Sequence, residues 1–506
     1  MNLNFDLMYE LFLRKSRDLL LDGKWGVERE LQRVTYEGDL ALTPHPKAFG
    51  DKLKNKEITT DFSESQMELI TPAFSSVEQV DDYLKYLYEE ARKGVGRELL
   101  WPLSMPPRLP DEEFIPISQF DHSEEGLAAY LYRQGLANRY GKKMQMISGI
   151  HFNFSFGKEL LQLLYSEFGL NSDARDMQDI RRMPEFSDEL YFSVARNFLR
   201  YRWLLIYLLG ASPSFDATYD TVLKEQVENI RKCCPECCEQ YDNYATSLRV
   251  SRYGYSNPEQ VRYSTYYNSK KEYIQGIREL LSQKSFKFAN LGIQLNTNIL
   301  QKDSEFYSPI RLKQITKQGE SQIDALDRRG VKYAEVRILD INPYIKTGIS
   351  LEQMRFLQVF MLYCLFEENR PIDSREMSRI NENHHLIALS GRKPGLMLNR
   401  LEGGKISLKE WGEDIFNKLT LIAKLLDQVD NGNTDNLSVK EDKENTNSQS
   451  VKEERENTYS LILQEEYRKL NDEALLPSAI LQNEMNNKNE SFLEFGIRKA
   501  KEYKRL

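Results

Sequence analysis

Polar and apolar residues alternate in several short segments of the chain, as they do in half-buried β-strands. The clearest segments are WGVERELQRV (25–34), MISGIHFNFSFG (146–157), LGIQLNTNIL (291–300) and VKYAEVRILDIN (331–342). Successive side chains of a strand point to opposite faces, so each segment is expected to form a strand with one polar face. The segment 61–72, DFSESQMELITP, leads from acidic residues into a short apolar stretch that Pro72 closes.

Helical periodicity separates these strands. It predicts helices at 1–22, 77–98, 123–143 and 351–367, and a long helix from Ser187, a plausible N-cap, to Leu209. Strands and helices in this order indicate an α+β protein. We expect a catalytic body over 1–430, a polar low-complexity insertion over 431–458 and a helical C-terminal segment over 459–506.

The expected insertion contains a near-duplication, SVKEDKENT at 438–446 and SVKEERENT at 450–458. A segment with so few apolar residues cannot offset its ordering entropy by burial. We interpret it as a tolerated loop expansion, with a partner-binding segment as the alternative.

Pairs of polar residues two positions apart lie within the otherwise apolar strands, so each pair shares one face. These pairs are Glu28 with Glu30, His151 with Asn153, Glu335 with Arg337, and Asn296 with Asn298. The simplest interpretation of any single pair is a face in contact with water. Their apolar and aromatic surroundings favour instead a covered face, where carboxylates require cations.

Three further carboxylates lie at Asp61, Glu64 and Glu68, which would share a face in a helix. A solvated helical turn is the simpler interpretation of Glu64. Carboxylates of this density suit Mg²⁺, and Mg²⁺ with one Arg suits phosphoryl transfer. The chain has no GxxxxGK[ST] loop and no GxGxxG after a strand. The residues alone therefore support a metal-dependent enzyme that uses ATP without a P-loop.

Composition removes some alternatives. The net charge of −8 argues against general binding of nucleic acid. No apolar run reaches the roughly 20 residues of a membrane span, and no signal peptide is recognisable, so we expect a cytoplasmic protein. Four of the five cysteines lie in Cys233-Cys234-Pro235-Glu236-Cys237-Cys238. Incidental thiols are the preferred interpretation of this cluster, with a regulatory disulfide or zinc as alternatives.

Several segments together resemble the proteobacterial-type glutamate–cysteine ligases, also called γ-glutamylcysteine synthetases. They are GVERELQRV, ITTDFSESQMELITP, WPLSMP, LYRQGLANRYG, ISGIHFNFS, LLGASPS, YATSLRVSRYGY, FYSPIR, YAEVRILDINP and GRKPGL, in family order from about residue 20 to 400. The resemblance implies a funnel-like antiparallel sheet of the glutamine synthetase-related type, surrounded by helices. It also implies that ATP phosphorylates the γ-carboxylate of L-glutamate and that the amine of L-cysteine then displaces phosphate, the first step of glutathione biosynthesis.

Site residues follow from the matching motifs. The resemblance implies metal ligands for Mg²⁺, with Mn²⁺ as an alternative, at Glu28, Glu30, Asp61, Glu68, His151 and Glu335. Arg337 is expected to contact the transferring phosphate, beside Glu335. Glutamate would be bound by Arg249, Gln145 and Asn153, and cysteine by Tyr132, Tyr255 and Tyr307. We expect a monomer with glutamate, cysteine and ATP as its ligands, and no nucleic acid or membrane partner.

Some of these roles have simpler alternatives. Tyr132 and Tyr307 could be core aromatics, His151 could be a hydrogen-bonded structural residue, and Arg337 could pair with Glu335 alone. For the whole protein, the alternatives are a related carboxylate–amine ligase that uses a different amine, and a silent binding or regulatory protein.

Overall fold

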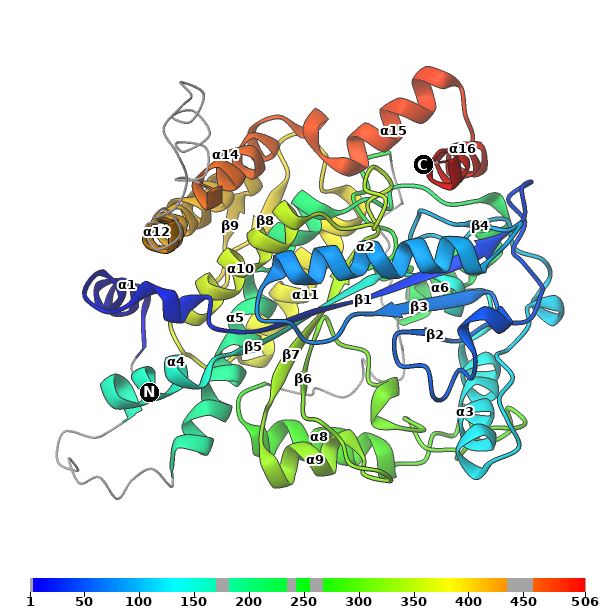
Figure 1. The fold of residues 1–506 in the computed structure, drawn as a ribbon, viewed down its shortest axis with the longest axis horizontal. Helices are drawn as coiled ribbons and strands as arrows, with labels where there is room; N and C mark the ends of the chain where they lie inside the picture. The colour runs from blue at the N-terminus through cyan, green and yellow to red at the C-terminus, as the bar shows by residue number, and fades with distance from the viewer. Residues whose placement is uncertain (1–2, 170–181, 234–242, 255–266, 435–457, 506) are drawn as a thin grey trace, which may run out of the picture.

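The computed structural model describes residues 3–169, 182–233, 243–254, 267–434 and 458–505. Its centre is a seven-stranded antiparallel sheet (Figure 1). The strands are β1 (Gly23–Val34), β2 (Ile58–Thr60), β3 (Gln66–Ile70), β4 (Leu99–Leu100), β5 (Ile150–Phe156), β6 (Ile310–Lys313) and β7 (Tyr333–Leu339). Their order is β2-β3-β1-β5-β7-β6, and β4 pairs with the end of β1. A separate hairpin joins β8 (Met397–Asn399) and β9 (Lys405–Ser407).

Helices surround the sheet, which confirms the predicted α+β class. They are α1 (Phe5–Arg14), α2 (Val77–Gly94), α3 (Glu124–Tyr140), α4 (Lys158–Leu164), α5 (Met183–Leu209), α6 (Asp220–Cys233), α8 (Lys270–Ser282), α9 (Gln322–Arg329), α10 (Leu351–Phe366), α11 (Ser374–Ser390), α12 (Leu408–Thr434), α14 (Thr458–Asn471), α15 (Pro477–Lys488) and α16 (Phe492–Arg505). Ser side chains cap several of them, and Ser350 forms a capping box with Gln353 at the start of α10.

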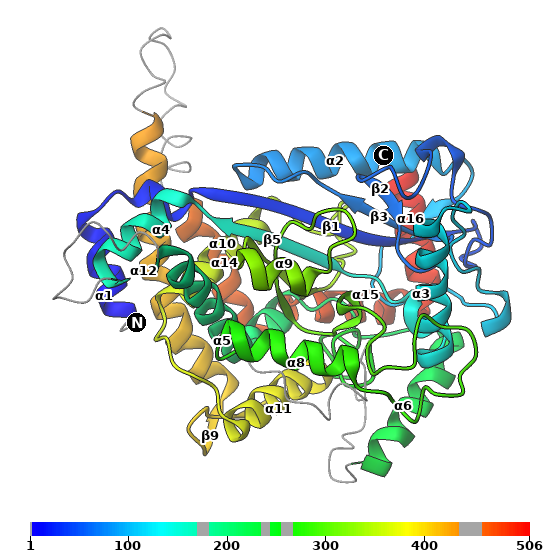
Figure 2. The same cartoon turned by 90° about the horizontal axis from the view of Figure 1, so that it is seen from below.

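One face of the sheet is apolar and covered. Val27, Phe152 and Val336 are fully buried there, and Trp25 packs on Phe152 and Phe154. Helix α2 lies alongside β1 on this face (Figure 2). Tyr88 of α2 lies under the guanidinium of Arg29, and Tyr191 of α5 packs against Phe156 of β5. This burial determines which strand residues point to the opposite face.

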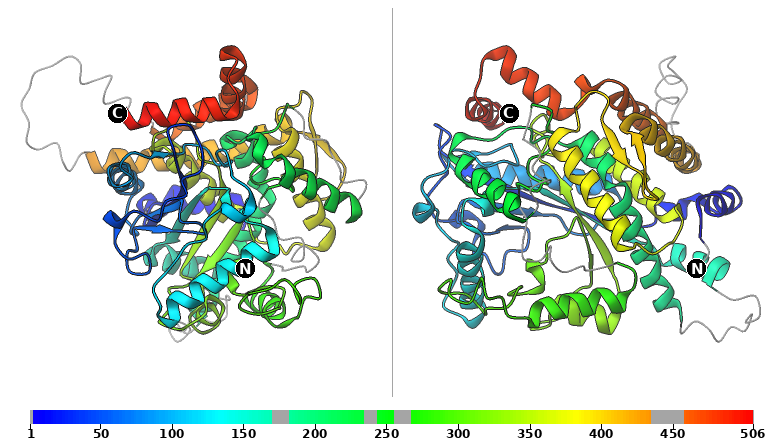
Figure 3. Two further views of the ribbon diagram at one scale, coloured as in Figure 1. Left: turned by 90° about the vertical axis from the view of Figure 1, so that its right-hand side faces the viewer. Right: turned by 180° about the vertical axis from the view of Figure 1, so that it is seen from behind.

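Helices α5 and α10 are buried on nearly all sides, since the sheet and α2 lie on one side and α11, α12 and α14 on the other. That position explains their continuous apolar sequences. Helices α14, α15 and α16 run along the upper edge in Figure 3, and α16 reaches β4. Most of the low-complexity segment and residues 234–238 of the cysteine cluster lie outside the described residues.

The structure changes three predicted elements. Residues 291–300 do not form a strand, since Gly292 adopts a φ of 79°. The side-chain amide of Asn296 donates to the carbonyl of Gln301, and that of Asn298 donates to the carbonyl of Leu281 in α8. Helix α5 begins at Met183, before Ser187. The expected helix over 1–22 divides into α1 and a 3₁₀ turn at Arg17–Leu20.

Candidate active site

The polar face of the sheet carries one continuous row of ionisable side chains. Opposite residues of an antiparallel pair share a face, and the register places Glu68 against Glu30 and Glu28 against His151. The same row continues from Asn153 to Glu335 on β7 and from Glu335 to Arg311 on β6. The paired strands thus bring together residues that lie more than 300 positions apart in the sequence.

The acidic half of this row has the spacing of a metal site. Ligand atoms of Glu28, Glu68 and His151 all lie within 4.8 Å of one another. The Nδ1 atom of His151 is 3.1 Å from Glu28, and its Nε2 atom is 3.7 Å from Glu30. Carboxylate oxygens with one imidazole nitrogen suit Mg²⁺ or Mn²⁺, so this donor set fits a hard divalent cation.

Electrostatics in the acidic half agree with that fit. Burial, together with the charges of Glu28 and Asp61, raises the pKa of Glu68 well above its usual value. Burial and the charge of Glu30 raise the pKa of Asp61 to about 6. These carboxyls repel one another and have too few protein cations nearby, so a divalent cation would favour their ionised forms.

The other half of the row is basic. Glu335 is 1% exposed, and its carboxylate lies 2.6 Å from Arg337, 3.0 Å from Lys313 and 3.8 Å from Arg311. Burial alone would raise the pKa of Glu335, but the charges of Lys313 and Arg337 hold that pKa well below its usual range. Arg337 and Glu335 therefore form an ion pair in this structure. The guanidinium also reaches to 3.4 Å from His151.

Arg249 lies close to the same face. Its guanidinium donates to the carbonyl of Arg337 at 2.9 Å and lies 3.7 Å from Asp340. Gly149 is essential to this packing, because a Cβ atom there would lie 1.8 Å from Nη2 of Arg249. The amide of Gly149 in turn donates to Glu30 at 2.8 Å. Gly149 therefore contacts both the guanidinium of Arg249 and a carboxylate of the row.

Several buried polar atoms here have no hydrogen-bond partner among the described residues. They are Nε2 of Gln145, Oδ1 of Asn153, Nη1 of Arg249 and Nε of Arg337. The other side-chain atom of Asn153 donates to Glu28 at 2.9 Å. Buried donors and acceptors are rarely left unpaired in proteins, so this group indicates a place for a polar ligand.

The tyrosines predicted to surround cysteine are only partly described. Tyr132 on α3 accepts a hydrogen bond from Ser304 at 3.4 Å, and its ring lies 5.3 Å from the ammonium of Lys302. Tyr307 is half-buried; burial raises its pKa, and the positive charges of Arg249 and Arg337 act against that rise. Tyr255 lies outside the described residues.

Four charged residues of this region were not predicted from the sequence. Arg311 and Lys313 on β6 point to the row of carboxylates, Arg133 on α3 donates to the carbonyls of Thr60 and Asp61, and Asp340 pairs with Arg249. The i, i+2 spacing of Arg311 and Lys313 was a detectable signal. The strand β6 is only four residues long, which made it hard to recognise.

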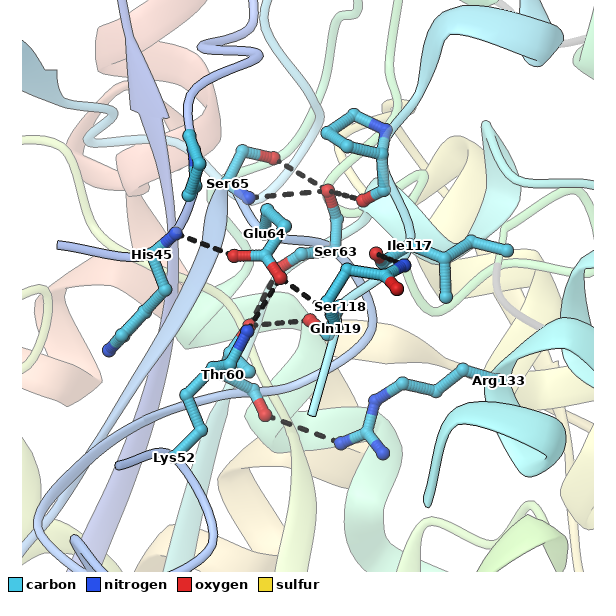
Figure 4. A network of polar contacts seen from close by, with 12 residues as sticks. His45, Lys52, Thr60, Ser63, Glu64, Ser65, Ile117, Ser118, Gln119 and Arg133 are labelled. Carbon is cyan, nitrogen blue, oxygen red and sulfur yellow. Dashed lines mark hydrogen bonds and ion pairs between the residues drawn. The ribbon is translucent and has the colours of Figure 1, made fainter. Parts of the chain in front are cut away.

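The interpretation of Glu64 as part of a solvated helical turn is wrong, and Asp61, Glu64 and Glu68 do not lie in a helix. Asp61 and Glu64 lie in the turn between β2 and β3, Glu68 lies in β3, and Glu64 is 5% exposed rather than solvated. Its carboxylate accepts from Lys52 at 2.5 Å and from the backbone amides of His45 and Gln119 at 2.5 and 2.6 Å (Figure 4). These contacts anchor the turn, and Asp61 lies at its start.

Comparison with known proteins identifies the family. The model of the glutamate–cysteine ligase family matches residues 8–387. A glutamate–cysteine ligase of Clostridium acetobutylicum is 48% identical and covers 99% of this chain and 100% of the relative. One from Pseudomonas syringae pv. syringae is 40% identical, covering 96% of this chain and 85% of the relative. The chain therefore belongs to the glutamate–cysteine ligase family.

Solved structures agree. A glutamate–cysteine ligase of Francisella tularensis in complex with AMP is similar with a TM-score of 0.79 and 29% identity, over 96% of this chain and 88% of that one. A bifunctional glutathione synthetase of Pasteurella multocida is similar with a TM-score of 0.71 and 26% identity, over 99% of this chain and 54% of that one.

None of the described helices is both long and apolar enough to cross a membrane.

Proposed function

We propose that this protein joins the γ-carboxyl of L-glutamate to the amine of L-cysteine with hydrolysis of ATP, the first step of glutathione biosynthesis. The observation that carries the proposal is the clustering of Glu28, Glu68 and His151 beside the Arg337–Glu335 pair, on one face of the sheet of a glutamate–cysteine ligase family member. AMP in the Francisella tularensis structure supports ATP as the co-substrate.

The chemistry has two steps. A carboxylate is a poor electrophile, so its γ-oxygen first attacks the terminal phosphorus of ATP, the bond to ADP breaks, and γ-glutamyl phosphate forms. The amine of cysteine then attacks the acyl carbon, inorganic phosphate leaves with the bonding electron pair, and the amine loses its proton. Positioning and charge neutralisation carry most of such phosphoryl transfer.

The row of carboxylates on the polar face of the sheet would hold the metal. The proposed metal ligands are Glu28, Glu30, Asp61, Glu68, His151 and Glu335. Bound Mg²⁺, or Mn²⁺ in its place, would neutralise charge on the phosphates during transfer. Arg337 would exchange part of its contact with Glu335 for a phosphate oxygen, which a guanidinium can bind in bidentate fashion.

The unpaired polar atoms support the substrate positions. Arg249 would bind the α-carboxylate of glutamate, with Gln145 and Asn153 completing the contacts from their unpaired atoms. Tyr132, Tyr255 and Tyr307 would surround the cysteine side chain, because an aromatic wall with hydroxyl tips suits a thiol.

We further propose the wider organisation that the family implies. The sheet would form a funnel of the glutamine synthetase-related type with metals toward its wider end. Residues 1–430 would form the catalytic body of a monomer, followed by the insertion over 431–458 and the helical segment over 459–506.

The test is phosphate release from ATP in the presence of glutamate and Mg²⁺, with cysteine or a panel of other amines. Release that requires cysteine is expected. Release that requires a different amine would support a related carboxylate–amine ligase, and no release with any amine would indicate a silent homologue.

A further inference from the structure

A cavity lies beside the β2–β3 turn, with Glu64 of that turn in its wall. Its volume is about 460 Å³, and its wall comes from the chain before β2, from Glu64 and from residues 116–119. Leu42, Pro44 and Ile117 make part of the wall apolar. A cavity of this size accommodates a small organic molecule.

His45 is a polar part of that wall. The side chain is more than nine-tenths buried, and both of its ring nitrogens are without a hydrogen-bond partner in the described part of the chain. Burial and the charges of Lys52 and Arg33 lower its pKa to about 4, so the ring is neutral near pH 7. A neutral imidazole offers one N–H donor and one acceptor nitrogen, and here neither is used.

The wall of the cavity contains two lysines, and only one of them has a carboxylate partner among the described residues. Lys52 is neutralised by Glu64 at 2.5 Å. Lys47 has no carboxylate partner among the residues that the structure describes, so the cavity carries one uncompensated positive charge. A single cation, an unused imidazole and an apolar wall complement a monoanion with an apolar body better than a hydrophilic dianion such as inorganic phosphate.

We propose that this cavity binds a small organic carboxylate with an apolar side chain, and that binding changes the affinity of the adjacent metal site. The carboxylate contacts Lys47 and the N–H of His45, and the side chain lies against Leu42 and Ile117. The second half of the proposal rests on the proposed function, because it requires Asp61 to be a metal ligand.

Glu64 connects the two sites. It is a wall residue of the cavity and lies in the same turn as Asp61, three positions away. A ligand carboxylate on Lys47 and His45 would repel the nearby carboxylate of Glu64, which accepts from the backbone amide of His45, and so would weaken the contacts that hold the turn. Because Asp61 belongs to the same turn, a displaced turn also changes the contact of the Asp61 carbonyl with Arg133 of α3. Figure 4 shows the neighbouring contact of Arg133 with Thr60.

Binding is tested by ligand-detected NMR titration of the full chain with isovalerate and phenylacetate, and with their uncharged amides as matched probes. Saturable binding of the acids is expected, with the amides at least about tenfold weaker. Lys47→Gln and Leu42→Glu should each weaken the acids about tenfold, while Lys56→Gln, an exposed lysine outside the wall, should not. Absence of saturation, or equal binding by the Lys47 and Lys56 variants, overturns the site.

Coupling is tested by Mg²⁺ titration of thermal stability with and without saturating isovalerate. The apparent Mg²⁺ affinity should change by about fivefold or more, and Mg²⁺ should change isovalerate affinity by the same factor, since linkage is reciprocal. If both ligands bind independently, the coupling is wrong and the site stands. If Mg²⁺ gives no stabilisation even alone, the metal assignment and the coupling fail together, while the NMR titration still decides the site.

Discussion

The Nδ1 atom of His151 on β5 lies 3.1 Å from the carboxylate of Glu28, the residue directly opposite it on β1. Strand pairing, and not a loop, therefore determines their distance. Burial alone would raise the pKa of Glu28, but the hydrogen bond from His151 holds that pKa below its usual value. The pKa of Glu28 is therefore lowered, whereas that of the neighbouring Glu68 is raised. Glu28 is ionised without a cation, and a bound cation would favour ionisation of Glu68.

Glu335→Gln should reduce turnover by about 100-fold or more while the protein stays folded. The amide loses the charge that Arg337 and Lys313 contact and is a poorer ligand for Mg²⁺. Steady-state rates with circular dichroism measure both outcomes. Glu352→Gln, an exposed change on α10, is the matched control. A near-normal rate for Glu335→Gln would contradict the metal assignment.

Mg²⁺ should stabilise the protein more at pH 7.5 than at pH 5. In the metal-free fold the pKa of Asp61 is raised to about 6, above its unfolded value near 3.8. The native state therefore binds more protons between these values, and metal-free stability falls as pH rises, by about 1.4 kcal/mol per pKa unit. Bound Mg²⁺ favours the ionised carboxyls, so it offsets this loss of stability at higher pH.

Thermal unfolding with and without Mg²⁺ across this pH range measures the effect. Asp61→Asn should reduce both the fall in metal-free stability and the gain from Mg²⁺. An Mg²⁺ effect independent of pH and of Asp61 would count against this ligand.

Arg249→Lys should raise KM for glutamate by about 10- to 100-fold and change KM for ATP little. A lysine ammonium cannot reproduce two parallel hydrogen bonds to the α-carboxylate, which are worth about 2 kcal/mol. Initial rates with each substrate varied in turn give the KM for glutamate and the KM for ATP separately. Arg328→Lys on the exposed face of α9 is the control. Equal changes in all KM values would indicate a general structural effect.

Glu64→Gln should lower the free energy of unfolding by about 2–3 kcal/mol at pH 7. The amide loses the charge that pairs with Lys52, and Lys52 remains largely buried. Burial would raise the pKa of Glu64, but hydrogen bonds from Gln119 and Lys52 hold it below 4.5. Its contribution is therefore complete above pH 4.5 and is lost as pH falls through the lower folded value.

Urea unfolding at pH 7 and at pH 4 measures this contribution, with the exposed Glu125→Gln on α3 as control. The difference between wild type and Glu64→Gln should shrink at the lower pH. If wild type and Glu64→Gln have the same free energy of unfolding at both pH values, the Glu64 carboxylate contributes no ionic stabilisation, as expected of a solvated residue.

The local pattern of the sequence determined the strands that carry the site and the faces of their side chains. Period-two alternation placed Glu28 and Glu30, His151 and Asn153, and Glu335 and Arg337 on common faces, because side-chain direction in a strand depends on neighbouring residues alone. The same rule failed at Asn296 and Asn298, whose side chains donate to the backbone carbonyls of Gln301 and of Leu281 in α8 and compete with strand formation.

Only the tertiary structure decided which of these faces meet. Strand order and register depend on contacts between distant segments, and they alone bring Glu68, Glu28, His151 and Glu335 into one row and add Arg311 and Lys313 from a strand too short to recognise. Burial likewise decided that Glu64 is a paired interior carboxylate, since the cations and amides that surround it come from residues 45, 52 and 119. Periodicity describes one segment at a time, whereas charge compensation depends on everything that packs around it.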